Sequence, residues 1–243
     1  MLSTDSECKF HLLALSMGEK VPFEIIKETP YWIAVNKPTG VIVEKNPYES
    51  LTMEGQVSAH LQQKTKQPFV GVVHRLDKAT SGVLIFAKKR SALKKLNRQF
   101  EERSVQKIYW ALVDGELPSN AGQLDHWLVK DAKAKRANIV EETVKGAKKA
   151  SLLYKVLAEK GDITLVEITL LTGRYHQIRA QFAAIACPII GDLKYRQEGD
   201  EYSKEIALHA RELTIKDPQR ENERNLKAPL PAQAWWDPFR GKS

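Results

Sequence analysis

Residues 82–87 (GVLIFA) form an almost uninterrupted apolar run, and this run constrains the fold more than any other segment. A strand that faces water on one side alternates apolar and polar side chains, whereas a continuous apolar strand is buried on both faces. We therefore expect residues 82–87 to form an inner strand of a sheet that is covered on both sides. The charged segment HRLDKATS, residues 74–81, comes directly before this strand.

The rest of the apolar pattern predicts more strands than helices. Further strands are expected at residues 23–35 (a hairpin or two short strands), 41–44, 71–73, 106–113, 152–158 and 163–171. Helices are expected at residues 51–64, 91–103 and 175–186, and polar loops at 130–149 (or an exposed hairpin), 196–205 and 216–227. Ser91 is expected to cap the second helix, and Pro188 to end the third. We predict an α+β fold with a largely antiparallel, mixed sheet flanked by helices and loops.

The length of 243 residues fits one large domain better than two. We expect residues 1–22 to form an N-terminal arm or tail, and residues 23–243 to form a single domain. No apolar run approaches 18 residues, so no transmembrane helix is predicted. Two cysteines, Cys8 and Cys187, are too few for a disulfide framework, which favours a reducing, cytoplasmic compartment.

The chain is basic, with 38 Lys and Arg against 30 Asp and Glu and a net charge of +8. This excess favours an anionic partner, either a nucleic acid or a membrane surface. Two stretches carry much of the charge: residues 88–107 have eight Lys or Arg against two acids, and residues 130–149 have seven against three. No basic amphipathic helix with enough apolar surface supports a membrane role.

The densest group of polar residues is HRLDKATSG at residues 74–82. Arg75 and Asp77 stand between two apolar strands, where charged groups are rare unless they are paired or used in chemistry. Asp77 is therefore a candidate nucleophile or base. The alternative is that Arg75 and Asp77 form an ion pair at the end of a strand.

A second group is TGRYHQIRAQ at residues 172–181, at a predicted strand-to-helix junction. Arg174, His176 and Arg179 lie there, and two arginines at a helix N-terminus can bind an anion. The alternative is ordinary surface charge on a helix. Tyr109, in the predicted strand at 106–113, is a third candidate, for which core packing is the alternative.

Other common sites leave no signature in this sequence. The six histidines show no HxxxH spacing and the cysteines no CxxC spacing, so no metal site is predicted. The chain also lacks GxxxxGK[ST], GxGxxG and GxSxG. Neither a nucleoside-triphosphate site nor a serine nucleophile of the hydrolase type is therefore expected.

Five segments, in this order, resemble the RluA family of pseudouridine synthases. They are VNKPTG at 35–40, HRLDKATSG at 74–82, KIYWALVDG at 107–115, LLTGRYHQIRAQFAAIACPIIGDLKY at 170–195 and LHARELTI at 208–215. The resemblance spans residues 23–232, which is nearly the whole chain. It implies the pseudouridine synthase catalytic fold, with an active-site cleft across the sheet.

The resemblance also implies a role for each motif residue. Asp77 matches the essential catalytic aspartate, and Arg179 matches the basic residue paired with it. Tyr109 matches the tyrosine that stacks against the target base and takes part in proton transfer. Arg75 matches the arginine that helps to displace the target uridine from the RNA stack. Further substrate-binding residues are expected to be His74, Lys107, Arg174 and His176.

The implied reaction breaks the N-glycosidic bond of a uridine within RNA, rotates the base and rejoins it through C5. No redox change or net hydrolysis occurs, so no cofactor is expected. Asp77 could attack the sugar, attack the base or remove a proton from the sugar carbon beside the bond, and the sequence leaves these routes open. We expect Arg179 to keep Asp77 ionised, because a nearby cation favours the charged form.

The expected substrate is transfer RNA or ribosomal RNA, with phosphates that follow the two basic stretches. We expect a monomer without an obligatory protein partner. Many family members carry an extra N-terminal RNA-binding module, for which residues 1–22 are too few, so target choice is expected to lie in the catalytic domain. Cys187 stands where the family usually has histidine, and we expect little effect on catalysis.

Two alternatives to the enzyme remain at this stage. The first is a non-catalytic RNA-binding or RNA-folding protein with the same fold. The second is a basic protein that binds DNA or an anionic membrane. The set of Asp77, Tyr109 and Arg179 argues against the first, because a binding protein has no need of a buried carboxylate near phosphates.

Overall fold

The computed structural model describes residues 23–47, 49, 51–196 and 205–241. The arm predicted at residues 1–22 and most of the loop predicted at 196–205 lie outside these residues. In the described part, the strands form one sheet in the order β1-β2-β4-β10-β5-β9-β8-β6-β7, with β3 paired to β4 and β11 to β10. All pairs are antiparallel except β4 with β10, so the predicted α+β fold and largely antiparallel sheet are confirmed.

The strands are β1 (Glu24–Glu28), β2 (Trp32–Lys37), β3 (Gly71–Val72), β4 (Ser81–Ala87), β5 (Gln106–Asp114), β6 (Ala121–Asp131), β7 (Arg136–Val140), β8 (Lys148–Lys160), β9 (Ile163–Leu170), β10 (Leu208–Lys216) and β11 (Glu223–Lys227). The helices are α2 (Met53–Gln62), α3 (Arg90–Glu101) and α4 (Gln177–Ala184), and a 3₁₀ helix η1 (Ala234–Phe239) follows them. Among the described residues, none of the helices has the length and apolar composition that a membrane-spanning segment needs.

Strand β4 is buried along its whole length, as its apolar sequence predicts. Alternate side chains of a strand point to opposite faces of the sheet. Val83 and Ile85 pack in the cluster that includes residues of α3. Leu84 and Phe86 pack in the cluster that includes residues of α2. Two helices thus cover the two faces of the strand that leads away from the candidate loop at 74–81.

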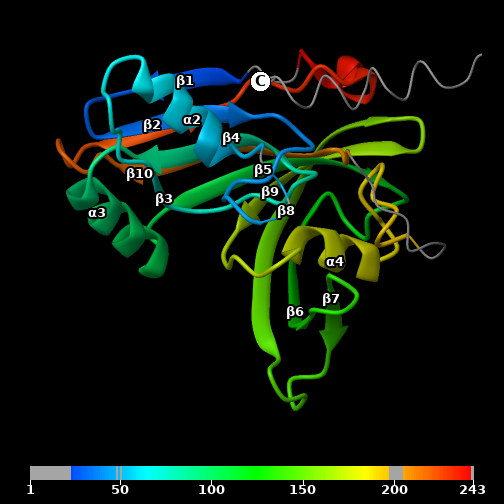
Figure 1. The fold of residues 1–243 in the computed structure, drawn as a ribbon. Helices are drawn as coiled ribbons and strands as arrows, with labels where there is room; N and C mark the ends of the chain where they lie inside the picture. The colour runs from blue at the N-terminus through cyan, green and yellow to red at the C-terminus, as the bar shows by residue number, and fades with distance from the viewer. Residues whose placement is uncertain (1–22, 48, 50, 197–204, 242–243) are drawn as a thin grey trace, which may run out of the picture.

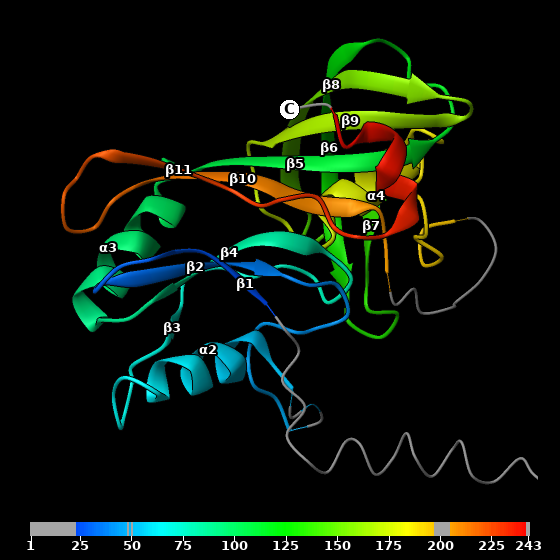
Figure 2. The same ribbon diagram turned by 90° about the horizontal axis from the view of Figure 1, so that it is seen from above.

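Helix α4 lies in a different part of the molecule from α2 and α3. Figures 1 and 2 show α2 and α3 beside the strands β1, β2 and β4, and α4 beside β6 and β7. Ala180 of α4 packs against Leu128 of β6 and Ala137 of β7. Residues 130–149, expected to be a loop or an exposed hairpin, contain the turn and second strand of the β6–β7 hairpin, whose first strand is not predicted.

Two predicted segments differ in the structure. Residues 41–44 are not a strand, because only Ile42 forms a bridge, to Thr52, while their valines pack with α2. Residues 216–227 contain β11 and are not only a loop. The Asp217 carboxylate accepts the backbone N–H groups of Gln219 and Arg220, and this turn returns the chain along β10.

Two helix ends also differ from the predictions. Helix α3 begins at Arg90 with Lys89 as its N-cap, so Ser91 is not the cap. Helix α4 is shorter than predicted. His176 and Ala186 adopt φ of 50° and 58°, values of the left-handed region, and these residues stop the helix at each end before Pro188 is reached.

The parallel contact between β4 and β10 requires glycine at position 82. Gly82 has φ 113°, and a Cβ there would lie 2.2 Å from the carbonyl oxygen of Ala210. We predict that Gly82→Ala lowers the free energy of unfolding by roughly 3 kcal/mol or more, from backbone strain and overpacking. Gly161→Ala is the matched control, since Gly161 has φ 59° with open space around it. The control should cost about 1–2 kcal/mol, and equal losses in urea unfolding would contradict the prediction.

Candidate active site

Asp77 lies in the loop between β3 and β4, and the turn after β2 holds this loop in place. Three donors of the turn reach carbonyl oxygens of the loop: Lys37 Nζ to Lys78 (3.1 Å), the Gly40 amide to Lys78 (2.8 Å) and Thr39 Oγ1 to Ala79 (2.9 Å). Gly40 adopts φ 80°, as the predicted turn requires. The segment VNKPTG therefore fixes the backbone on which Asp77 stands.

Lys37 is fully buried, and no described carboxylate lies within ion-pair distance of it. Its ammonium donates to the carbonyls of Pro38 (2.9 Å) and Lys78 (3.1 Å). Burial lowers the pKa of Lys37 to about 7, although the charge of Asp77 acts in the opposite direction. The residue thus supplies loop-binding donors and a titratable charge near Asp77.

Arg179 of α4 faces two carboxylates. Its Nε and Nη2 donate to the two oxygens of Asp192 at 2.6 and 2.7 Å, a bidentate pair in which the Asp192 carboxylate is fully buried. Its Nη1 lies 3.7 Å from Oδ2 of Asp77, whose side chain is 26% exposed. Asp192 therefore forms the short bidentate ion pair with Arg179. Asp77 has only the longer contact, which leaves most of the lone pairs of its carboxylate unoccupied.

His176 sits between the same groups, and its hydrogen bonds define its tautomer. Arg179 Nη1 lies 3.1 Å from His176 Nε2, and a guanidinium can only donate, so Nε2 accepts. The proton is then on Nδ1, which donates to the Tyr195 hydroxyl at 3.0 Å. Nε2 faces Asp77 at 3.6 Å with a lone pair and gives it no proton. Burial and the charge of Arg179 lower the pKa of His176 to about 2, which keeps the ring neutral.

Tyr195 connects this group to the β6–β7 hairpin. Its hydroxyl oxygen also accepts the backbone N–H of Ala137 on β7 at 2.7 Å. The Arg179 guanidinium lies over its ring, 5.1 Å from the centroid. His176 is held in the left-handed region at a cost of roughly 1–3 kcal/mol, and these contacts offset that cost. The hairpin, α4 and the segment after α4 thus position one set of groups around Asp77.

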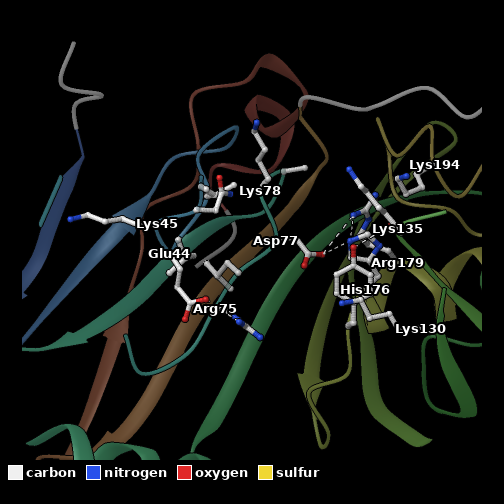
Figure 3. Close-up of a pocket in the computed structure, with 16 residues that line it drawn as sticks. Glu44, Lys45, Arg75, Asp77, Lys78, Lys130, Lys135, His176, Arg179 and Lys194 are labelled. Carbon is white, nitrogen blue, oxygen red and sulfur yellow. Dashed lines mark hydrogen bonds and ion pairs between the residues drawn. The ribbon is translucent and has the colours of Figure 1, made fainter. Parts of the chain in front are cut away.

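Two cavities meet at Asp77. One, of about 500 Å³, has aromatic and apolar side chains that do not line the other cavity: Tyr109 of β5, His74, Phe100 and Leu208. The other, of about 410 Å³, has a wall of lysines. Figure 3 shows Asp77 between Arg75 and Lys78 on one side and His176 and Arg179 on the other.

Arg179 lowers the pKa of Asp77, as we expected, but other effects outweigh it. Burial raises the pKa of Asp77, while the charges of Arg179 and Lys37 lower it and that of Asp192 raises it. The net pKa lies above the ordinary value, because burial and the charge of Asp192 together outweigh the two cations. Burial and the charge of Asp77 also raise the pKa of Tyr109, which keeps it a neutral phenol.

The structure places the other predicted residues around the Tyr109 cavity. His74 Nε2 accepts the Ile85 amide (3.2 Å) and its ring stacks on Phe100, and burial lowers the pKa of His74 to about 3. Its remaining nitrogen is therefore a donor. Arg75 is 71% exposed and pairs with Glu44 at 2.9 Å.

Two cationic residues complete the rim of this cavity. Arg174 donates to the carbonyl of Lys149 at 2.9 Å, which leaves its terminal nitrogens available. Burial and the charge of Arg103 lower the pKa of Lys107. Both side chains line the cavity that holds Tyr109.

Sequence reasoning did not identify Asp192, Tyr195 or Lys37 as parts of the site. Each charged residue had a signal: Asp192 is the one acid in the segment IIGDL, and Lys37 follows Asn36 at the end of the apolar run WIAV. A charge in such a setting is paired or used, but its partner is far away in the chain. Among the described residues, no three His, Cys, Asp or Glu side chains gather as a metal site would need.

Comparison with known proteins gives one consistent family. Residues 31–184 match the family described as RNA pseudouridylate synthase. The chain is 36% identical over 194 residues to an uncharacterized RNA pseudouridine synthase of Aquifex aeolicus, covering 77% of this chain and 60% of that protein. It is 33% identical to the dual-specificity RNA pseudouridine synthase RluA of Vibrio vulnificus, covering 85% of this chain and 82% of that protein.

Two further comparisons agree with these. The ribosomal large subunit pseudouridine synthase C of Rickettsia felis is 33% identical, over 95% of this chain and 73% of that protein. Among solved structures, human RNA pseudouridylate synthase domain containing 4 matches with a TM-score of 0.72 and 26% identity, over 93% of this chain and 94% of that chain. The predicted fold class is thereby confirmed.

The buried ammonium of Lys37 predicts a pH-dependent stability. Its pKa is about 7 in the folded protein and 10.5 ordinarily, so the unfolded chain binds more protons between these values. The free energy of unfolding should therefore rise over this window, by an amount on the order of a few kcal/mol relative to Lys37→Met. Urea unfolding of both proteins from about pH 6 to about pH 10.5 measures the difference. If the free energies of unfolding of the two proteins change with pH in parallel, the cost assigned to the burial of the Lys37 ammonium is contradicted.

Proposed function

This chain belongs to the RNA pseudouridylate synthase family, and on that premise we propose that it isomerises uridines within RNA to pseudouridine. Asp77 is the catalytic carboxylate, Tyr109 the residue that stacks on the target base, and Arg179 the cation that faces Asp77. The observation that carries the proposal is the partly exposed Asp77 carboxylate between a buried guanidinium and a cavity with aromatic walls.

The reaction exchanges one bond for another within a single nucleotide. The bond between C1′ and N1 breaks, the uracil rotates, and a bond between C1′ and C5 forms. C5 then loses its proton and N1 gains one, so the product is an isomer of the substrate. Asp77 can serve as nucleophile toward the sugar or the base, or as the base at C2′. Each of these roles needs a carboxylate with free lone pairs, which the long contact with Arg179 leaves available.

Tyr109 begins the reaction as a phenol, because burial and Asp77 raise its pKa. A phenol that takes the C5 proton must pass its own proton on at the same time. At that step, Asp77 and the N1 atom already freed from C1′ are the acceptors that the reaction offers. The ring itself supplies the stacking surface for an extruded base, whose removal from the RNA stack costs a few kcal/mol.

The RNA chain follows the basic surface, and the two basic stretches contribute unequally. In residues 88–107, Lys88 is paired with Glu28 at 2.7 Å and Arg98 with Glu102 at 2.7 Å, so part of that charge is neutralised. The β6–β7 hairpin keeps Lys130 and Lys135 at the edge of the cleft. We assign the principal phosphate contacts to the hairpin.

The substrate class is transfer RNA or ribosomal RNA. The names of the relatives point to large-subunit ribosomal RNA and, for RluA, to a dual specificity. Residues 23–243 act as one catalytic domain, as a monomer in the cytoplasm and without an obligatory protein partner. His74, Lys107 and Arg174 contact the substrate, and Arg75 at the rim helps to displace the target uridine from its stack.

The proposal predicts that Asp77→Asn lowers pseudouridine formation by at least about 100-fold, since the amide cannot replace a carboxylate as nucleophile or base. RNA affinity should stay the same or rise, because a negative charge near phosphates is removed. The assay incubates unmodified transcripts of transfer RNA and large-subunit ribosomal RNA with the protein, and maps pseudouridine by site.

Asp114→Asn is the matched control, because Asp114 lies at the end of β5 and pairs with Arg196 away from the cavities. The control should keep full activity. Equal activity of Asp77→Asn and the wild type would overturn the role of Asp77. Absence of pseudouridine with the wild type on both classes of transcript, despite tight binding, would favour a non-catalytic RNA-binding protein.

A further inference from the structure

The second cavity at Asp77 differs in chemistry from the one that holds Tyr109. It has a volume of about 410 Å³ and begins at Asp77, His176 and Arg179, which it shares with the first cavity. No residue of β5 lines it. Its distinguishing side chains are Lys45 and Lys78 on one wall and Lys130, Lys135 and Lys194 on the other, as Figure 3 shows. Walls of this kind suit the phosphate of a nucleotide.

The positive charge is uncompensated mainly on the hairpin side. On the opposite wall, Arg75 pairs with Glu44 and Lys78 with Glu49, each at 2.9 Å. Within the described ranges, no carboxylate lies within ion-pair distance of Lys130 or Lys135. The charges of Lys130 and Lys194 are felt at His176, whose pKa they help to lower. A positive potential therefore exists beside Asp77 before any RNA binds.

Tyr175 adds an aromatic surface at the boundary of the two cavities, and it lines both. One face stacks on His176, with centroids 3.9 Å apart and planes at 17°. Its hydroxyl donates to the carbonyl of Lys135 at 3.2 Å. The Lys130 ammonium lies 4.8 Å from the ring centroid, and the side chain is still 37% exposed. The ring is thus held in place, and part of it is open to a ligand.

We propose that this cavity binds the nucleotide that adjoins the target uridine in the RNA chain, with its base on Tyr175 and its phosphate at Lys130 and Lys135. The inference rests on the proposed function, because a uridine whose C1′ is beside Asp77 must have its neighbour one nucleotide length away. The lysine cavity begins at Asp77 itself, and Tyr109 does not line it. When the base stacks on Tyr175, the Lys130 ammonium leaves the tyrosine ring and binds the phosphate of the same nucleotide instead.

The test compares two labelled probes by fluorescence anisotropy. The first is the pentamer of uridylate, and the second has the same backbone but keeps only the central base. Tyr175→Ala should raise the Kd of the first probe about tenfold and leave the Kd of the second unchanged. Equal effects on both probes, or none on either, would overturn the stacking role.

Two controls separate stacking from a structural role of Tyr175. Tyr175→Phe keeps the ring but removes the hydrogen bond to Lys135, and it should bind the first probe within about twofold of the wild type. A decrease in affinity as large as that of Tyr175→Ala would show that the hydroxyl merely braces the hairpin, and would overturn the proposal. Tyr31→Ala removes a similar ring under Lys89, 4.4 Å away, outside both cavities, and it should change nothing.

The salt dependence of probe binding tests the phosphate contact separately. Lys130→Gln combined with Lys135→Gln should weaken both probes alike and reduce the slope of log Kd against log salt by about 0.7 for each lysine–phosphate interaction that the substitutions remove. Lys160→Gln, at the far end of β8 and outside both cavities, is the charge-matched control and should leave the slope unchanged. An unchanged slope in the double variant would overturn the assignment.

These binding measurements do not depend on turnover. If the probes show the predicted pattern but no RNA gains pseudouridine, the nucleotide subsite stands and the proposed function fails. If pseudouridine forms but Tyr175→Ala affects both probes alike, the function stands and the subsite fails.

Discussion

The site depends on the buried ion pair between Arg179 and Asp192. Taking two charges out of water costs several kcal/mol per ion unless their geometry is good, and here two bonds of 2.6 and 2.7 Å satisfy both groups. The pair leaves one guanidinium nitrogen for Asp77, at 3.7 Å. A bidentate bond from Arg179 to Asp77 itself would have occupied the lone pairs that the proposed reaction needs. Asp192 takes that bond instead, and Asp77 keeps a charged neighbour and an accessible oxygen.

The same arrangement explains why the surrounding segments have their shapes. The loop that carries Asp77 is held by donors of the turn after β2. His176, strained at φ 50°, is fixed between Arg179 and Tyr195. Tyr195 in turn holds the hairpin through the Ala137 amide. In the proposed function, RNA that binds the hairpin lysines touches the element that orients Arg179 and His176 beside Asp77, so that substrate binding and site geometry share the same contacts.

Local pattern is enough to predict much of the fold, whereas the grouping of Asp77, Tyr109 and Arg179 in one site is predicted from the resemblance of their motifs to the RluA family. The apolar run of β4 and the motif around Asp77 carry their own signals, and burial of that strand on both faces is confirmed. Strand β11 is not predicted, because its alternation is weak and its pairing depends on the turn at Asp217. The role of Asp192 does not follow from the residues, since its partner is defined only when α4 and the following segment pack together. The sign of the effect of Arg179 on Asp77 is predictable from the residues, whereas the burial that outweighs it and raises the pKa of Asp77 is defined only by the folded site.

The most direct test of this account is the rate of pseudouridine formation at saturating RNA with Asp192→Asn, alongside Asp192→Glu, which keeps the buried charge. Losing the carboxylate frees the guanidinium to move, so the rate should fall on the order of 100-fold. The RNA concentration at half-saturation should be unchanged, since Asp192 is fully buried. Asp192→Glu should recover part of the rate, and near-ultraviolet circular dichroism establishes that each variant is folded. A folded Asp192→Asn protein with the wild-type rate at saturation would contradict the account.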